Sequence, residues 1–350
     1  MKKLSAPGPA HGAAELPAVI VDTYNAELRD ADGFVGDRAS NSAFRAILDD
    51  LRERLRAVGE DPLGETPTED LSKKQLEKVL EKGDPEAVGV VQGAMEEFAS
   101  ELTAVIGRFM KLKHWKDVER IVVGGGLRGS RIGELVIGRT LVMLKAAGNK
   151  VDLAPIHHDP DEAGLIGAVH LVPPWMLAGH EAILAVDIGG SNLRAGIVEL
   201  NLKKEKDLSK AEVTDFTLWR YADEPEKPSR DQAVERIGEM LSLHAKRALR
   251  DLKVAPFIGI ACPGIITPEG TIERGGQNLP GNWESSRFNL PARIREMLPQ
   301  IGDDETMVVM HNDAVVQGLS EVPFAKGVER WGVLTIGTGL GNATYTSRTA

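Results

Sequence analysis

An acidic residue followed by two glycines forms the first candidate site. Asp187 ends an apolar run that we expect to be a buried strand, and it is followed by Ile, Gly189, Gly190, Ser191 and Asn192. Two glycines let the backbone turn tightly with amides facing outward, and the serine and asparagine add side-chain donors, which suits a phosphate. The carboxylate would then hold a magnesium ion, directly or through water. An ordinary hairpin turn is the alternative, because Gly-Gly is common there.

A second glycine-rich segment follows another apolar run near the end of the sequence. Gly337, Gly339 and Gly341 stand at alternate positions, and Thr338 adds a hydroxyl. This spacing permits close approach of the backbone to an anion. The segment is not a Walker A loop, because no lysine follows the last glycine. It is not a dinucleotide fingerprint either, because we expect a strand rather than a helix after it.

A carboxylate follows a predicted strand at 307–310. Asn312 and Asp313 come directly after this strand and begin a predicted helix. Ligand sites of α/β proteins gather at the carboxyl ends of strands. A carboxylate there could accept the proton of a sugar hydroxyl as that hydroxyl attacks a γ-phosphate. The alternative is an ordinary helix cap, which is the commonest role of an aspartate at such a position.

Polar amides also stand close to an aromatic residue. Asn278, Asn282 and Trp283 share one short segment, which follows a Pro-Gly turn. Amides can bind the hydroxyls of a sugar while an aromatic ring provides an apolar floor. Taken separately, each of these residues is equally compatible with a surface loop.

Alternating strands and helices must position these residues, which gives an α/β class with mixed sheets. Asp84-Pro85-Glu86 has the order of an N-cap, a first-turn proline and a first-turn acid, so it predicts the start of a long helix. The predicted strands are 121–123, 151–156, 183–187, 193–200, 213–220, 257–262, 307–310, 332–336 and 343–346. The predicted helices are 40–55, 71–80, 84–109, 130–146, 163–171, 231–252, 291–298 and 314–322.

Taken in order, the motifs of residues 182–346 resemble the N-terminal half of ROK sugar kinases. These kinases belong to the actin-like superfamily, with acetate and sugar kinases and heat-shock chaperones. The motifs are the Gly-Gly turn after Asp187, Pro263-Gly264, Asn-Leu-Pro-Gly-x-Trp at 278–283, Asn-Asp at 312–313 and Gly-Thr-Gly-x-Gly at 337–341.

Segments of the first half resemble the C-terminal half of the same family, also in order. They are residues 34–44, 83–87, 121–126 and 161–168. In the family this half follows the Gly-Thr-Gly-x-Gly hairpin, whereas here it comes first, so the resemblance implies a circular permutation. Domain termini often lie close together, and a short bridge, here about 171–181, can join them. The same pairing made between two chains, as a swapped dimer, is the alternative.

The resemblance implies a fold of two actin-like (ribonuclease-H-like) lobes around a cleft, circularly permuted. We expect residues 1–17 to be a flexible tail. The larger lobe is expected at 18–160 plus 326–350. The smaller lobe is expected at 161–325, and it includes the family's C-terminal helix at 161–172.

The activity that the resemblance implies is ATP-dependent phosphorylation of a hexose or amino-sugar hydroxyl. Asp313 would be the general base, and Asp187 would hold Mg²⁺, directly or through water. The ATP-binding residues would be Gly189, Gly190, Ser191, Asn192, Gly337, Thr338, Gly339, Gly341 and, near the adenosine, Gly124, Gly125 and Gly126. The residues hydrogen-bonded to the sugar would be Asn278, Asn282 and Asn312.

Two features of the family are missing. ROK kinases usually hold structural zinc with a cysteine cluster and a histidine, but this sequence has one cysteine, Cys262. They also usually carry Glu-x-Gly-His after the glycine hairpin, and residues 1–35 do not supply it. A sugar- or nucleotide-binding protein without turnover is therefore one alternative. A sugar-responsive regulator is another, although the expected tail offers no DNA-binding helix-turn-helix.

The composition limits the partners. The formal net charge is −10 and the pI about 5.4, so an acidic surface disfavours nucleic acid. No apolar run approaches the roughly 18 residues of a membrane span, and the first residues lack the apolar core of a secretory signal. We therefore expect a cytoplasmic protein that binds a small sugar, with monomer and homodimer both left open.

Overall fold

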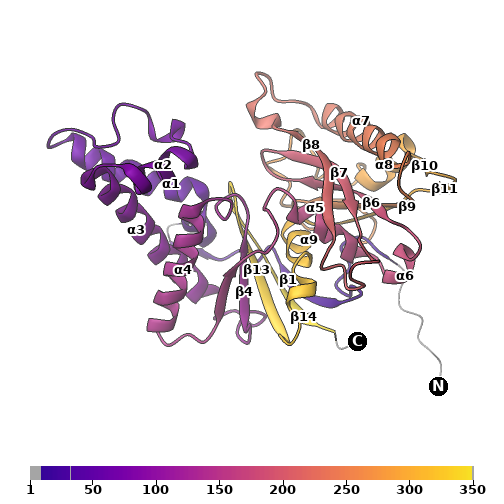
Figure 1. The fold of residues 1–350 in the computed structure, drawn as a ribbon, viewed down its shortest axis with the longest axis horizontal. Coiled ribbons are helices and arrows are strands. Elements are labelled where there is room, and N and C mark those ends of the chain that lie inside the picture. Colours follow the sequence, from indigo (N-terminus) through magenta and orange to yellow (C-terminus); the bar gives the residue numbers. More distant parts are fainter. Residues whose placement is uncertain (1–8, 32, 349–350) are drawn as a thin grey trace. The chain divides into compact units, whose positions relative to one another are not determined.

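The computed structural model describes residues 9–31 and 33–348. It divides into two compact units, and each is described by itself (Figure 1). The first unit comprises residues 9–25, 162–327 and 345–348 of the described chain. The second comprises residues 26–31, 33–161 and 328–344.

The first unit is built on a five-stranded sheet in the order β12-β9-β6-β7-β8. Its strands are β12 (Met307–Asn312), β9 (Val254–Cys262), β6 (Ala182–Ile188), β7 (Leu193–Glu199) and β8 (Glu212–Trp219). β6 runs antiparallel to β7 and parallel to β9, and β12 is parallel to β9. Every residue of β6 is buried, which is expected of a central strand covered on both faces.

Helices cover the sheet of the first unit on both faces. α7 (Arg230–Ala248) and α8 (Leu290–Met297) share one apolar cluster with side chains of β6 and β9. α5 (Ala163–Gly167) and α9 (Asp313–Leu319) pack against each other and against β9. Helix 163–171 was predicted as one element, and the structure divides it into α5 and the 3-10 helix η3 (Ala168–Leu171).

The second sheet has the order β1-β14-β13-β4-β5. Its strands are β1 (Val19–Tyr24), β14 (Leu340–Ser347), β13 (Arg330–Ile336), β4 (Arg120–Gly124) and β5 (Asp152–Pro155). β13 pairs with β4 in parallel, and Arg330 N–H donates to Glu119 Oε1 across 211 positions of sequence. β1 lies outside the predicted strands.

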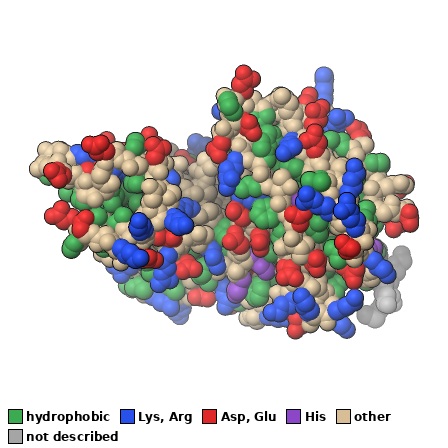
Figure 2. Space-filling view, turned by 45° about the horizontal axis from the view of Figure 1, so that its top comes forward, with side chains coloured by type: hydrophobic (Ala, Val, Ile, Leu, Met, Phe, Trp, Pro, Cys, Tyr) green, Lys and Arg blue, Asp and Glu red, His purple; other side chains and the backbone are tan. Residues whose placement is uncertain are grey.

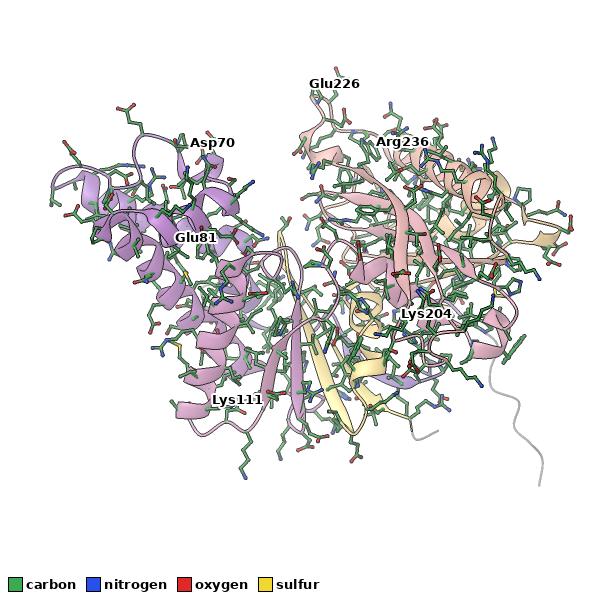
Figure 3. All side chains as sticks on the ribbon, viewed as in Figure 1. Asp70, Glu81, Lys111, Lys204, Glu226 and Arg236 are labelled. Carbon is green, nitrogen blue, oxygen red and sulfur yellow. The ribbon has the colours of Figure 1, made fainter. Side chains whose placement is uncertain are left out.

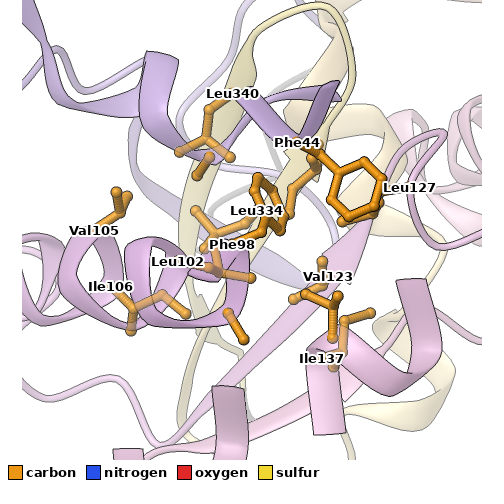
Figure 4. Close-up of a cluster of buried hydrophobic side chains, with 14 of the residues drawn as sticks. Phe44, Phe98, Leu102, Val105, Ile106, Val123, Leu127, Ile137, Leu334 and Leu340 are labelled. Carbon is orange, nitrogen blue, oxygen red and sulfur yellow. The ribbon is translucent and has the colours of Figure 1, made fainter. Parts of the chain in front are cut away.

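Helices of the second unit bury their apolar faces in one cluster (Figure 4). They are α1 (Asn41–Arg56), α2 (Lys73–Lys82), α3 (Pro85–Phe109) and α4 (Arg131–Ala146). In this cluster Phe98 of α3 packs edge-on against Phe44 of α1, with ring centroids 5.7 Å apart. The predicted N-cap of α3 is confirmed, because Asp84 accepts hydrogen bonds from Glu86 N and Ala87 N.

The remaining elements are short. They are β2 (Arg29–Asp30), β3 (Gly33–Phe34), β10 (Gln300–Ile301), β11 (Asp304–Glu305), α6 (Pro174–Leu177), η1 (Val35–Ala39), η2 (Thr68–Asp70), η4 (Tyr221–Asp223) and η5 (Val322–Phe324). Within residues 9–31 and 33–348, the helices are all too short or too polar to cross a bilayer. Acidic and basic side chains are interspersed on the face shown in Figure 2.

The segment predicted as a tail makes defined contacts where it is described. Residues 1–8 lie outside the described residues. Leu16 is buried, and Gly12 N–H donates to Met310 O at 3.0 Å. The proline, glycine and alanine content that predicted a loose tail does not prevent backbone hydrogen bonds to a neighbouring strand, because such bonds need no particular side chain.

Candidate active site

Asp313 is the first residue of α9, directly after β12. The N-cap of this helix is Asn312, whose Oδ1 accepts a hydrogen bond from Val315 N at 3.2 Å. The capping role weighed for Asp313 is therefore filled by its neighbour. Asn312 Nδ2 also donates to Asp313 Oδ1 at 2.9 Å and to Gly264 O at 3.1 Å. The carboxylate of Asp313 is thus oriented by the residue before it.

Burial, with the nearby charge of Asp187 adding to its effect, raises the pKa of Asp313 to about 6. The hydrogen bond from Asn312 acts in the opposite sense, because it favours the ionised carboxylate. Burial also raises the pKa of the Cys262 thiol, with Asp313 and Asp187 adding to the effect. The structure therefore brings the two predicted acids together, and one of them titrates close to neutral pH, as a general base requires.

Asp187 lies near the carboxyl end of β6, opposite Arg194 of β7. Arg194 Nη1 is 3.6 Å from Asp187 Oδ2. On another side the carboxylate meets α5, because a Cβ added to Gly164 would lie 2.5 Å from Asp187 Cγ. The carboxylate therefore lies between the Arg194 side chain and Gly164 of α5, which has no side chain.

Hydrogen bonds to backbone carbonyls hold the turn after Asp187. Gly189 N–H donates to Asn192 O at 2.8 Å, and Ala222 N–H donates to Ser191 O at 3.2 Å. The Tyr221 hydroxyl donates to Gly189 O, and burial raises the pKa of Tyr221. Tyr221 could not be predicted as a neighbour of this turn, because nothing in the local sequence pattern links it to a turn about thirty residues earlier.

The amides predicted to bind a sugar fall into two groups. Asn278 and Asn282 are exposed, and a Cβ at Gly190 would be 3.3 Å from Asn278 Cβ, so Asn278 lies beside the turn. Asn312 is buried, and its amide is engaged by the bonds described above. A sugar-binding role for these three residues stays a prediction.

The expected aromatic floor is absent at Trp283. Its side chain is only 1% exposed, its ring lies 5.4 Å from that of Phe288, and its Nε1–H donates to Pro280 O. Trp283 is therefore part of the hydrophobic core of the first unit. Burial of the ring is favourable because the side-chain N–H keeps a hydrogen-bond partner, a backbone carbonyl of the same loop.

The glycine segments of the second unit lie next to each other. Leu127 N–H donates to Ile336 O, and Asn41 N–H donates to Gly337 O. Gly125 has φ +80°, and a Cβ there would lie 2.5 Å from the oxygen of Ile336, so only glycine fits. Gly124 is buried and paired with Thr335, whereas Gly126, Thr338 and Gly339 are exposed and Gly341 is half-buried in β14. Backbone from both segments is thus available to one ligand.

Lys73 is a further polar group beside these glycines. Its Nζ donates to Gly126 O, and burial, followed by the charge of Arg45, lowers its pKa. As the first residue of α2 it stands where the helix dipole disfavours a cation. Residues 71–80 were predicted only as a helix, and no local signal distinguishes Lys73 from Lys74.

A cavity of about 450 Å³ in the first unit contains none of the predicted site residues. Trp219, Glu226 and Arg236 are among the residues that line it, and the last two are labelled in Figure 3. Four glutamates and two basic residues surround it. Its acidic lining does not suit a phosphate, so we place the candidate site at the Asp187 turn instead.

We predict that the purified protein contains no stoichiometric zinc. Within residues 9–31 and 33–348, no three His, Cys, Asp or Glu side chains are grouped closely enough to hold a metal ion, whereas structural zinc takes four ligands. Elemental analysis after dialysis should give well under one zinc per chain. A chelator should inhibit only by removing magnesium. One tightly held zinc per chain would contradict this prediction. Its candidate ligands would be the adjacent histidines His157 and His158.

Comparisons with known proteins are consistent with a kinase over part of the chain. No family model matches. A glucokinase of Thermotoga maritima is 29% identical over 166 residues, which are 47% of this chain and 44% of that protein. The chain thus spans less than half the length of this curated relative.

Solved structures give only weak overall similarity. A ROK hexokinase from Thermus thermophilus is 24% identical, with 47% of this chain and 46% of that chain covered and a TM-score of 0.31. A PPX-GPPA enzyme from Aquifex aeolicus is 14% identical, with 66% and 83% covered and a TM-score of 0.32. Over about half of its length, the chain is distantly similar to a sugar kinase, glucokinase.

Proposed function

We propose that the protein transfers the γ-phosphoryl group of ATP to a hydroxyl group of a hexose or an amino sugar. The observation that carries the proposal is the pairing of Asp313 and Asp187 in the first unit. One carboxylate is buried, has a pKa raised to about 6 and is oriented by Asn312, and the other lies near the end of β6, just before the Gly189-Gly190 turn. The similarity to glucokinase supports the same reaction.

The chemistry uses few groups. The sugar oxygen forms a bond to the γ-phosphorus, and the bond between that phosphorus and the bridging oxygen breaks. ADP leaves with the electron pair of the broken bond, and the hydroxyl proton passes to the Asp313 carboxylate. Positioning of the reactants and neutralisation of charge account for most of the catalysis in such reactions.

Magnesium fits the residues that are present. Asp187 offers a carboxylate, the ligand class that Mg²⁺ prefers, and Mg²⁺ is usually held by one or two carboxylates together with substrate phosphates. A single acid at the phosphate turn is therefore sufficient. When bound, the ion supplies charge neutralisation on the phosphates. The nucleotide contacts of Gly124 to Gly126 and of the Gly337 to Gly341 segment stay predictions.

The direct test is a coupled assay of ADP release over a panel of hexoses and amino sugars, with ATP and Mg²⁺. We expect one or a few sugars to raise ADP release well above the rate without sugar, and mass spectrometry to find the matching sugar phosphate. If ATP and a sugar both bind by calorimetry but no phosphorylated product forms, the protein is a binding protein without turnover. If neither binds, the proposal fails.

The pH dependence of turnover follows from Asp313. The base must be ionised, and its pKa is about 6, so kcat should fall about tenfold per pH unit below that value and level off above it. The measurement is kcat between pH 5 and 8.5 at saturating ATP, Mg²⁺ and sugar. A profile that stays flat down to pH 5 would contradict the assignment.

We infer that the two halves of the kinase sequence are joined here in circularly permuted order. It is supported by the parallel pairing of β13 with β4 and by the packing of α5 against β6, since each joins one sequence half to the other. The two described ends also lie close together. Arg348 N–H donates to Ala18 O at 2.9 Å, and Arg348 Nη1 donates to Leu16 O at 3.2 Å.

A re-permuted chain tests this inference. It would open the bridge between the exposed residues Ala178 and Gly179, and a short Gly/Ser linker would join residue 348 to residue 9. We expect it to fold with a melting temperature within roughly 2–4 °C of the parent, equivalent to about 1 kcal/mol for units of this size, and to keep its turnover. An unfolded product would show that the fold requires the present chain order, contrary to the inference.

A further inference from the structure

His311 is a buried histidine beside the proposed base. It is fully buried at the end of β12, two residues before Asp313. Burial lowers its pKa to about 4, so the ring is neutral at physiological pH. A neutral imidazole has one donor and one acceptor nitrogen, and both are used here.

The acceptor nitrogen holds the backbone of the next residue. Asn312 N–H donates to His311 Nδ1 at 2.7 Å. Asn312 in turn orients the Asp313 carboxylate through its side-chain amide. The ring is therefore two hydrogen bonds away from the carboxylate that we propose as the base.

The donor nitrogen is anchored by the N-terminal segment. His311 Nε2–H donates to Ala13 O at 3.1 Å, which fixes the tautomer. The same segment is tied to β12 twice more, since Met310 N–H donates to His11 Nδ1 and Gly12 N–H donates to Met310 O. Tyr24 packs edge-on against the His311 ring at 5.3 Å.

We propose that His311 is a positioning residue for Asp313, and that the N-terminal segment at residues 11–13 sets the orientation of its ring. The proposal rests on the function proposed above. It makes this segment part of the structure that positions the proposed base, through its hydrogen bonds to β12. A core histidine that only fills space would need neither an acceptor contact to Asn312 nor an anchor outside the sheet.

The kinetic test compares substitutions of His311. His311→Leu keeps the buried volume roughly constant but removes both hydrogen bonds. We expect kcat to fall about 10²-fold, the effect of displacing a catalytic group by about 1 Å, with KM for ATP changed less than twofold. His311→Asn offers an oxygen to the Asn312 N–H in place of Nδ1 and should recover a large part of kcat.

Gly12→Ala disturbs the anchor without touching the ring. Gly12 has φ +56°, and a Cβ there would lie 2.2 Å from Ile266 O, so the segment must shift. We expect a fall in kcat in the same direction as for His311→Leu. Val309→Ala is the matched control, because Val309 is buried on the same face of β12 and its side chain makes none of the hydrogen bonds described above. It should lower the melting temperature but leave kcat within twofold of the parent.

A spectroscopic test does not depend on turnover. Nitrogen-15 NMR of labelled histidine should show the His311 ring protonated at Nε2 only, from pH 8 down to about pH 5. In Gly12→Ala and His311→Leu, the backbone and side-chain amide signals of Asn312 should move, whereas in Val309→Ala they should stay. If the parent protein has no kinase activity but the Asn312 signals still move in Gly12→Ala and His311→Leu, the proposed function is wrong. The hydrogen-bonded network around His311 is then still supported.

Two results would overturn the proposal. One is an Asn312 amide whose signals are unchanged in His311→Leu, which would show that the ring does not hold it. The other is a fall in kcat in Val309→Ala as large as that in His311→Leu. This would show that the loss of kcat comes from general destabilisation of β12.

Discussion

Asp313→Asn should reduce kcat on the best sugar by about 10²–10⁴-fold, the range typical of a lost general base. Asparagine has nearly the same shape and can still hydrogen-bond Asn312, but it cannot accept the hydroxyl proton. ATP affinity should change little, because the residue does not belong to the predicted nucleotide segments. Steady-state kinetics and ATP titration calorimetry measure the two quantities.

The same substitution should not destabilise the fold. The folded-state pKa of Asp313 is raised to about 6 from 3.8, so its contribution to stability is present below the unfolded pKa and is lost as pH rises through the folded one. A neutral amide avoids this loss at pH 7.5, and the melting temperature should stay the same or rise. Wild-type turnover in Asp313→Asn would disprove the base, whereas low activity with a lower melting temperature would indicate misfolding.

Gly164→Ala should impair both stability and turnover. The added methyl group would lie 2.5 Å from Asp187 Cγ and within 2.8 Å of both carboxylate oxygens, so α5 or Asp187 must move. Overpacking of this kind costs about 1–3 kcal/mol of the free energy of unfolding. Displacing the acid that we propose to hold magnesium by about 1 Å should lower kcat by about 10²-fold and raise the Mg²⁺ concentration needed for half-maximal rate.

Gly138→Ala provides the matched control. Gly138 is also inside a helix, α4, but a Cβ there would meet nothing within 4 Å. Alanine is favoured over glycine in a helix interior by about 1 kcal/mol, so this variant should be slightly more stable and fully active. Equal behaviour of the two variants would show that α5 does not lie against Asp187.

Local patterns predicted most elements, because their signals are short-range. The Asp84 cap, the hairpin of β6 and β7 and the apolar run of β9 depend on a few neighbouring residues. The positions of Asp313 and Asp187 at the carboxyl ends of strands could also be predicted, whereas their catalytic roles stay proposals.

Features that depend on distant parts of the chain could not be predicted in this way. Tyr221, Lys73 and His311 owe their environments to residues far away in sequence, and nothing in their own segments distinguishes them from surface residues. Trp283 was misinterpreted for a related reason. Its motif suits a sugar site equally well whether the ring faces solvent or the core, and only the position of Phe288 decides between the two.

The strand order β1-β14-β13-β4-β5 places the last strands of the chain inside a sheet whose other members come from its first half. During synthesis β4 therefore emerges long before its partner β13, and the edge of β4 that β13 covers stays open until residues 330–336 have left the ribosome. Open strand edges favour pairing with other chains. Slow translation or high expression should therefore promote aggregation of nascent chains, and a chaperone that shields β4 until release should improve the yield of folded protein.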